Sequence, residues 1–218
     1  MLSVLYAIGI PATLNMALPS FLVSALNAIL ASFSQTYVVV LGVYYKLQTF
    51  LYLTANGMIQ GMRPIMSYNY GAKNTDRVKG TFFLLLKASL TYSIILWGLV
   101  MLFPQVFAGI FTSNPALVIF TKKALRVYMA VMFMFGIQIS CQMAFNSLGK
   151  AISSIVVAVM RKFVLLIPLI YIMPHIFTTD QTMAVYMAEP VADFIAVTFT
   201  AILFSVQFKK ALAAIRLS

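Results

Sequence analysis

Polar side chains that could bind a ligand lie at helical spacing inside apolar segments of this chain. Gln138, Gln142 and Asn146 are each four residues apart. A step of four drifts by only about 40° around a helix, so the three share one stripe. Polar groups at membrane depth are costly and face a bundle interior or a water-filled cavity. The stripe therefore either makes interhelical hydrogen bonds or forms one wall of a wet, ligand-binding cavity.

Two other apolar segments carry a stripe of the same kind. Its members are Lys46, Thr49, Asn56 and Gln60 in one segment, and Ser20, Ser24, Asn27 and Ser34 in the other. Serine and threonine are common packing residues in membrane helices, so the amides and the lysine are the stronger candidates. The predicted substrate-binding residues are Asn27, Lys46, Asn56, Gln60, Gln138, Gln142 and Asn146. A lysine about ten residues into an apolar helix either titrates or extends its ammonium to the membrane surface.

Four charged residues interrupt the last two apolar segments. Glu189 and Asp193 are four apart, with Pro190 between them, so both carboxylates lie on one helix face. They could share a proton, bind a cation, or pair with Arg161 or Lys162. Pairing is the preferred interpretation, since an unpaired charge inside a membrane is expensive. We also expect Arg161 and Lys162 to lie in the cytoplasmic third of their segment and to snorkel toward the surface.

The residue types that most enzymes use are scarce here. His175 is the only histidine and Cys141 the only cysteine. Zinc motifs built on several His or Cys, and disulfides, therefore lack the residues they need, and no Ser-His-Asp triad or phosphate-binding loop is recognisable. The sequence predicts a protein that is not an enzyme, with no catalytic residues, no metal site and no bound cofactor.

The composition indicates an all-α integral membrane protein. The chain is 62% hydrophobic and only 9% charged, with a mean hydropathy of +0.98, whereas a soluble domain carries about 25% charged residues. The apolar runs are continuous rather than alternating, which is typical of helices and not of a membrane barrel. The net charge of +11 comes from cations at the ends of apolar runs. That distribution favours cytoplasmic loops over nucleic-acid binding.

Six segments reach the length of about 20 residues that a spanning helix needs. They are Ser3–Phe33, Tyr37–Met62, Phe82–Phe103, Ala124–Leu148, Ala151–Phe177 and Met183–Phe208. Between the third and fourth, Pro104–Lys123 is too short and interrupted to span. Its apolar residues predict an amphipathic stretch on the membrane surface.

The loop cations predict the orientation. Eight of them would lie on one side of the membrane: Arg63, Lys73, Arg77, Lys79, Lys150, Lys209, Lys210 and Arg216. Three would lie on the other: Lys122, Lys123 and Arg126. Cytoplasmic loops carry the excess of Lys and Arg, so both termini are expected in the cytoplasm. No Lys or Arg precedes Lys46, and from this bare first segment we expect the chain to begin inside a longer parent sequence.

One segment between two apolar helices has the form of a sequence motif. Residues 61–72 read Gly-Met-Arg-Pro-Ile-Met-Ser-Tyr-Asn-Tyr-Gly-Ala, which predicts a basic, turn-forming loop outside the lipid. Gly61 and Gly71 would allow tight backbone geometry, and Asn69 would cap the following turn. The segment resembles the loop of the MATE (multidrug and toxic compound extrusion) transporters through Gly61, Pro64, Asn69, Gly71 and Ala72. Further matches are Ile8–Pro11, Gly42–Gln48, Phe145–Lys150, Arg161 with Leu166–Pro168, and Glu189–Asp193.

The resemblance implies both a fold and a function. MATE proteins are built as two six-helix lobes around a central cavity, and they export amphipathic cations and toxic compounds by exchange with Na⁺ or H⁺. By resemblance, residues 1–218 would be one lobe, helices seven to twelve of twelve, in the bacterial cytoplasmic membrane. Its partners would be membrane lipid, the cationic substrates, and a missing N-terminal lobe or a second copy of the chain.

Two alternatives to an exporter lobe stay open. A lipid-linked oligosaccharide flippase of the same superfamily would have a more cationic cavity, to which Lys46, Arg161 and Lys162 could contribute. A non-transporting scaffold or fragment is the other, and the charge-poor start at Met1 favours it.

Overall fold

The computed structural model describes residues 20, 24, 27–28, 35–111, 114–177 and 181–217, and every element in these ranges is helical. The elements are α2 (Gln35–Gly71), α3 (Thr75–Leu102), α4 (Pro104–Phe111), α5 (Pro115–Tyr128), η1 (Met132–Met134), α6 (Phe135–Ser147), α7 (Ala151–Val159), η2 (Met160–Leu166), α8 (Ile167–Ile176) and α9 (Gln181–Leu217). The predicted first segment, Ser3–Phe33, lies largely outside the described residues.

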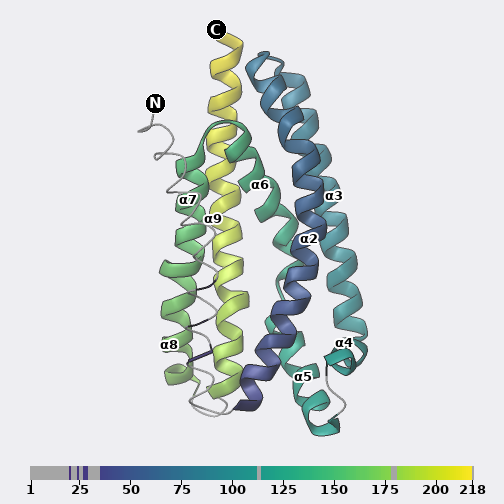
Figure 1. The fold of residues 1–218 in the computed structure, drawn as a ribbon. Helices are drawn as coiled ribbons and strands as arrows, with labels where there is room; N and C mark the ends of the chain where they lie inside the picture. Colours follow the sequence, from purple (N-terminus) through teal and green to yellow (C-terminus); the bar gives the residue numbers. More distant parts are fainter. Residues whose placement is uncertain are drawn as a thin grey trace.

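The long helices form an elongated bundle (Figure 1). Contacts are most extensive between α8 and α9, between α2 and α3, and between α3 and α6. The turn between α2 and α3 lies at the same end as the C-terminal end of α9, opposite α4 and α5 (Figure 1). The loop cations of the predicted cytoplasmic group that fall in described segments therefore gather at one end of the bundle.

Three helical stretches are long and apolar enough to cross a membrane: Thr75–Leu102, Ala151–Ile176 and Met183–Ile215. A fourth span is possible within the described part of the chain, where Pro115–Tyr128 and Met132–Ser147 pass the same test together but are bent by 47°. These stretches agree with the predicted third, fifth and sixth segments to within several residues at their ends.

The predicted loop at residues 61–72 is wrong. α2 continues through Pro64 to Gly71, and the connection to α3 is a tight turn at residues 72–74, closed by bonds from Ala72 N to Tyr68 O and from Asn74 N to Asn69 O. Neighbouring helices allow a membrane helix to tolerate a proline, so Pro64 does not end the helix.

The roles expected inside this motif also fall on other residues. The left-handed position of the turn is Lys73, with φ 58°, rather than Gly71. Asn69 donates to the carbonyl of Ile65 in its own helix at 2.8 Å. The cap of α3 is Asn74, whose side chain accepts from the N–H of Arg77 at 3.1 Å.

The predicted surface stretch Pro104–Lys123 divides into two helices with different roles. α4 is a short helix, and α5 begins at Pro115 with Asn114 as its cap. The cap accepts from Ala116 N at 3.1 Å, and Pro115 occupies a first-turn position where a missing N–H costs nothing. α5 then continues toward α6 as one half of the bent span. Of the predicted stretch, only α4 is therefore left as a short helix outside the spans.

The fifth span contains a π-helix, η2, between α7 and α8. Its last turn is closed by a bond from Ile167 N to Lys162 O, five residues back, which is the π-helical spacing. Pro168 follows directly. In an α-helix its ring would clash with the carbonyl four residues earlier, so the wider turn relieves that contact.

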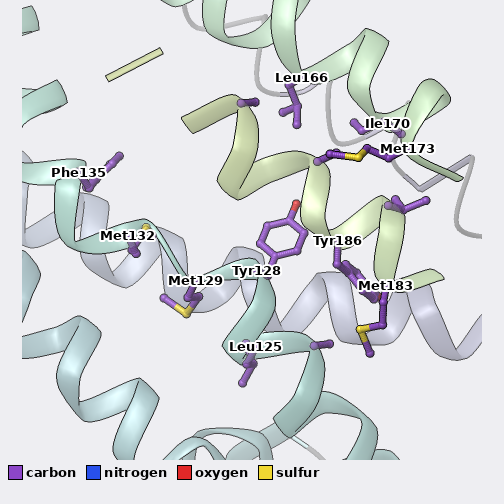
Figure 2. Packing of buried hydrophobic residues seen from close by; sticks show 14 of the residues in the cluster. Leu125, Tyr128, Met129, Met132, Phe135, Leu166, Ile170, Met173, Met183 and Tyr186 are labelled. Atoms are coloured by element: carbon purple, nitrogen blue, oxygen red, sulfur yellow. The ribbon is translucent and has the colours of Figure 1, made fainter. Parts of the chain in front are cut away.

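Two hydrophobic clusters hold the bundle together. One joins α5, η1, the end of η2, α8 and the first half of α9, and Figure 2 shows Tyr128, Met129, Leu166, Ile170 and Tyr186 among its members. The other packs Phe82, Phe145, Phe204 and Phe208 between α3, α6 and the second half of α9. Since lipid is as apolar as these side chains, close packing rather than water exclusion is the source of their stabilisation.

Candidate functional site

An ion cluster joins the fifth and sixth spans inside the bundle. Arg161, in η2, donates from Nη2 to Glu189 Oε1 at 3.2 Å and from Nε to Asp193 Oδ1. The side chains of the three residues are 5–13% exposed. Because the carboxylates are four residues apart on α9, one planar guanidinium reaches both.

Aromatic hydroxyls extend this cluster toward α5 and α2. The Tyr128 hydroxyl donates to Glu189 Oε2 at 3.4 Å, and Tyr45 of α2 places its hydroxyl beside that of Tyr128. Lys162, the next residue of η2, adds a second cation that interacts with both carboxylates over a longer range. Both oxygens of Glu189 are thus engaged by donors from different helices.

This geometry confirms the predicted pairing of Glu189 and Asp193 with Arg161 or Lys162, and the directly bonded partner of both is Arg161. It also corrects the expectation that Arg161 snorkels, because its guanidinium points into the bundle and contacts α9. The wide turn of η2 was not predictable from the cations themselves. Tyr128 and Tyr45 were not among the predicted site residues, and no spacing pattern distinguishes them from the other tyrosines of the chain.

The predicted amide stripe on α6 runs from the buried interior to the surface. Gln138 is 3% exposed, Gln142 is half-buried and Asn146 is exposed. Within the part of the chain that the structure describes, Gln138 Oε1 has no hydrogen-bond partner. A buried amide oxygen without a donor costs about 1–3 kcal/mol, so this atom is suited to a partner from outside the described residues.

The predicted residues of α2 lie level with those of α6. Tyr52 packs on Phe135 with ring centroids 5.3 Å apart, and Ser67 donates to the carbonyl of Ser147 at 3.2 Å. Because residue numbers rise together from the first contact to the second, α2 and α6 run in the same direction. Counting along both helices from Tyr52 and Phe135 places Asn56 at about the same level as Gln138. Gln60 is likewise at about the height of Gln142.

The exposure of the remaining candidates differs along the stripe. Asn56 is half-buried, whereas Lys46 and Gln60 are exposed. Asn27, on the first predicted segment, is half-buried, but its surroundings lie outside the described residues. The Thr49 hydroxyl donates a hydrogen bond to the Tyr45 carbonyl of its own helix at 2.7 Å, so this bond does not connect α2 to another helix.

The motif segment lines a recess at the end of the bundle. The recess has a volume of about 550 Å³ and lies between Met62 and Ile65 of α2 and Asp76, Arg77 and Thr81 of α3. Gly61, Pro64, Gly71 and Ala72 are exposed and Asn69 is half-buried. The segment therefore shapes the α2–α3 connection and lies far along the helices from the ion cluster.

One further cation was not among the predicted residues. Lys87 lies in the middle of α3 and is exposed. An ammonium at that depth in a spanning helix requires water or a polar partner. The position of Lys87 within a long apolar run was the feature of the sequence that could have marked it as a candidate.

Comparison with known proteins places this arrangement of helices in a family. The MatE family profile matches residues 11–172, which is most of the chain. The chain belongs to the MATE family. Members of this family are membrane transporters rather than enzymes, in agreement with the apolar helices and with the prediction of a non-enzyme.

Relatives of this MATE chain include proteins named for multidrug export. The "Multidrug export protein MepA" of Staphylococcus aureus (strain NCTC 8325 / PS 47) is 27% identical over 177 residues, covering 81% of this chain and 39% of the relative. The protein of the same name from Staphylococcus haemolyticus (strain JCSC1435) is 23% identical over 197 residues, covering 90% of this chain and 43% of the relative.

Solved MATE structures share the fold. The MATE multidrug transporter DinF-BH superposes with a TM-score of 0.80 and 32% identity, covering 92% of this chain and 44% of that protein. A MATE structure in the bent conformation gives a TM-score of 0.88 at 16% identity and covers 97% of this chain, which is a likeness of fold alone. The chain spans less than half the length of the relatives it matches.

Proposed function

We propose that residues 1–218 form a single six-helix lobe of a MATE exporter, with the first predicted segment, Ser3–Phe33, as its first helix. Its membership of the family and the three or four spans of the described residues support this. The lobe would pair with a second six-helix lobe, either another segment of polypeptide or a second copy of this chain. The share of each relative that the chain covers, 39–48%, is what one of two lobes would cover.

The transported compounds in this proposal are amphipathic cations, including drugs and toxic compounds. The observation that carries it is the stripe on α6, where the buried Gln138 offers a carbonyl oxygen that no described residue satisfies. Such an oxygen orients a ligand in an otherwise apolar pocket. Asn27, Lys46, Asn56, Gln60, Gln142 and Asn146 would complete the wall. The multidrug names of the relatives support this class of substrate.

Export would be coupled to inward movement of Na⁺ or H⁺ across the cytoplasmic membrane. Both termini would lie in the cytoplasm, as supported by the gathering of loop cations at the end of the bundle that holds the α2–α3 turn (Figure 1). Alternating access requires two bodies that rock about a shared site near the midplane. The chain alone would therefore insert into the membrane without exporting, and a second lobe would be needed for transport.

The flippase alternative has less support than the exporter. Anionic oligosaccharide carriers would require free cations on the cavity wall. Arg161 instead holds two carboxylates. A scaffold without transport activity would not require the predicted binding of amphipathic cations, so the binding experiment separates it from an exporter.

The proposal is tested by binding of a panel of fluorescent amphipathic cations to the purified chain. Gln138→Leu and Gln142→Leu should change the order of affinities across the panel while membrane insertion is unchanged. Ser205→Ala is the matched control, because Ser205 is exposed on α9 and bonds to the Ala201 carbonyl of its own helix. A loss of stability in both glutamine variants, with the order of affinities across the panel unchanged, would instead assign the stripe to helix packing.

A further inference from the structure

The ion cluster holds one more carboxylate than its central cation can neutralise. Arg161 contributes one positive charge, and Glu189 and Asp193 contribute two negative charges. Lys162 offsets the difference only through longer-range interaction. Lys162 makes no direct bond to either carboxylate, so one of the two lacks a bonded cation of its own. That is expensive inside a spanning bundle, and a proton on one carboxylate removes the cost.

Glu189 is the carboxylate placed to take that proton. It is 4% exposed. Arg161 faces it from η2 at 3.2 Å, Tyr128 faces it from α5 at 3.4 Å, and Tyr45 of α2 and Lys162 of η2 complete the charged and titratable groups around it. Asp193 lies one turn along α9 and is held by the Nε of the same arginine. Protonation of Glu189 therefore leaves Arg161 paired with Asp193.

We propose that Glu189 is the proton-exchange site of this lobe, with Arg161 and Asp193 as its fixed counter-charges and Tyr128 as its hydrogen-bonding partner. A proton delivered by hydronium forms an O–H bond at Glu189 Oε2 and leaves a water molecule. The Tyr128 hydroxyl, which donates to the carboxylate, then accepts from the carboxylic acid. The role of this site in coupling rests on the proposed exporter function and names H⁺ as the coupling ion. The binding of the proton itself does not depend on transport.

The surroundings of Glu189 favour a proton over a metal cation. Na⁺ would need several oxygen ligands, as hard cations do. Here donors already occupy both oxygens of Glu189 and one of Asp193, and the guanidinium stands where a metal ion would have to enter. A proton needs only one lone pair and no coordination shell.

The side chains of Tyr128 and Tyr45 connect the ion cluster to α5 and α2. Tyr128 connects Glu189 to α5, and Tyr45 continues the line to α2. α2 also carries the predicted stripe of Lys46, Asn56 and Gln60. A hydroxyl can donate and accept, so Tyr128 connects the carboxylate to a second titratable side chain, Tyr45, on the helix that carries the predicted stripe.

The test uses infrared spectroscopy on the purified full chain as a function of pH. Glu189 is the only glutamate in the sequence, so glutamate with a heavy-carbon carboxyl group labels this site without any mutation. We expect a carboxylic-acid band that appears on acidification, moves to lower frequency with labelled glutamate and does not respond to labelled aspartate. A band that responds only to aspartate, or no glutamate-sensitive band over the pH range in which the chain stays folded, would overturn the proposal.

Two variants and one ion exchange sharpen this result. Tyr128→Phe should move the labelled band to higher frequency, because the acid loses a hydrogen bond, whereas Tyr171→Phe on the exposed face of α8 should leave it in place. Replacing Na⁺ by K⁺ at constant ionic strength should leave the titration unchanged. A titration that depends on Na⁺ would assign the site to a metal cation. Because the spectra need neither substrate nor a second lobe, failure of export and failure of proton binding are separate outcomes.

Discussion

The hydroxyls of Ser89 and Ser140 lie 2.8 Å apart where α3 and α6 meet. Ser89 also donates to the Gly136 carbonyl at 3.1 Å. A Cβ at Gly136 would stand 2.7 Å from Leu90 N and from the Ser89 carbonyl carbon. The two helices are therefore joined through small residues and buried hydroxyls, which is the usual way in which membrane helices approach closely.

Gly136→Ala should separate α3 from α6. The added methyl group meets backbone atoms that cannot rotate away, so we expect a loss of about 1–3 kcal/mol in the free energy of unfolding. Unfolding in detergent, followed by the fluorescence of Trp97, the only tryptophan, measures it. Gly98→Ala in α3 is the control, since nothing lies within 4 Å of its position. Equal stability of the two variants would contradict the close contact.

Arg161→Gln should destabilise the chain far more than Lys162→Gln. Removing the guanidinium leaves both carboxylates of the cluster without their direct donor, and breaking such a buried pair costs about 3–5 kcal/mol. Thermal unfolding of the two variants in the same detergent makes the comparison. Adding Asp193→Asn to Arg161→Gln should recover part of the loss. If Lys162→Gln proved as damaging, the cluster would depend on its total charge rather than on the bonds of Arg161.

Asn74→Ala should weaken the start of α3. Its side chain satisfies the N–H of Arg77, and loss of an N-cap costs about 0.5–2 kcal/mol. Asn69→Ala is the matched control, because the Asn69 side chain bonds within its own helix and its loss should cost less. Hydrogen exchange at the first turn of α3 reports the effect locally. A larger effect from Asn69 would support the sequence-based assignment of the cap.

Accessibility labelling tests the orientation. In a Cys141→Ala background, a cysteine at Ala72 should react only from the cytoplasmic side and one at Gln181 only from outside, because these exposed residues lie at opposite ends of the bundle. Labelling with a membrane-impermeant reagent in intact cells and inverted vesicles distinguishes the two. The reverse pattern would reject the predicted cytoplasmic termini.

Three of the six predicted spans were confirmed, and a fourth corresponds to the bent pair, because hydropathy determines which stretches can lie in lipid. The predicted second segment, Tyr37–Met62, lies in α2, which is not among the stretches that are long and apolar enough to span. The fifth segment was predicted at Ala151–Phe177 and is found at Ala151–Ile176. The errors concern where helices end or bend. Residues 61–72 were interpreted as a loop, yet α2 passes through Pro64 to Gly71, since in a bundle the neighbouring helices decide whether a helix continues past a proline.

Two features had no local signal that could be recognised. The bend between α5 and α6 falls at Met129–Val131, with neither proline nor glycine to mark it. For the site, the spacing of Glu189 and Asp193 predicted a shared face, and pairing with Arg161 followed from the cost of buried charge. The contribution of Tyr128 could not be predicted, because it depends on how α5 packs against α9, which no pattern within either helix encodes.

The π-helical segment η2 changes how the fifth span can be compared with its relatives. A π-turn takes one more residue than an α-turn, so positions before Met160 and after Leu166 do not follow one continuous helical wheel. A helical wheel drawn through the whole span therefore misplaces Arg161 relative to the residues of α8. A comparison of this span with that of a relative has to be made separately on the two sides of η2.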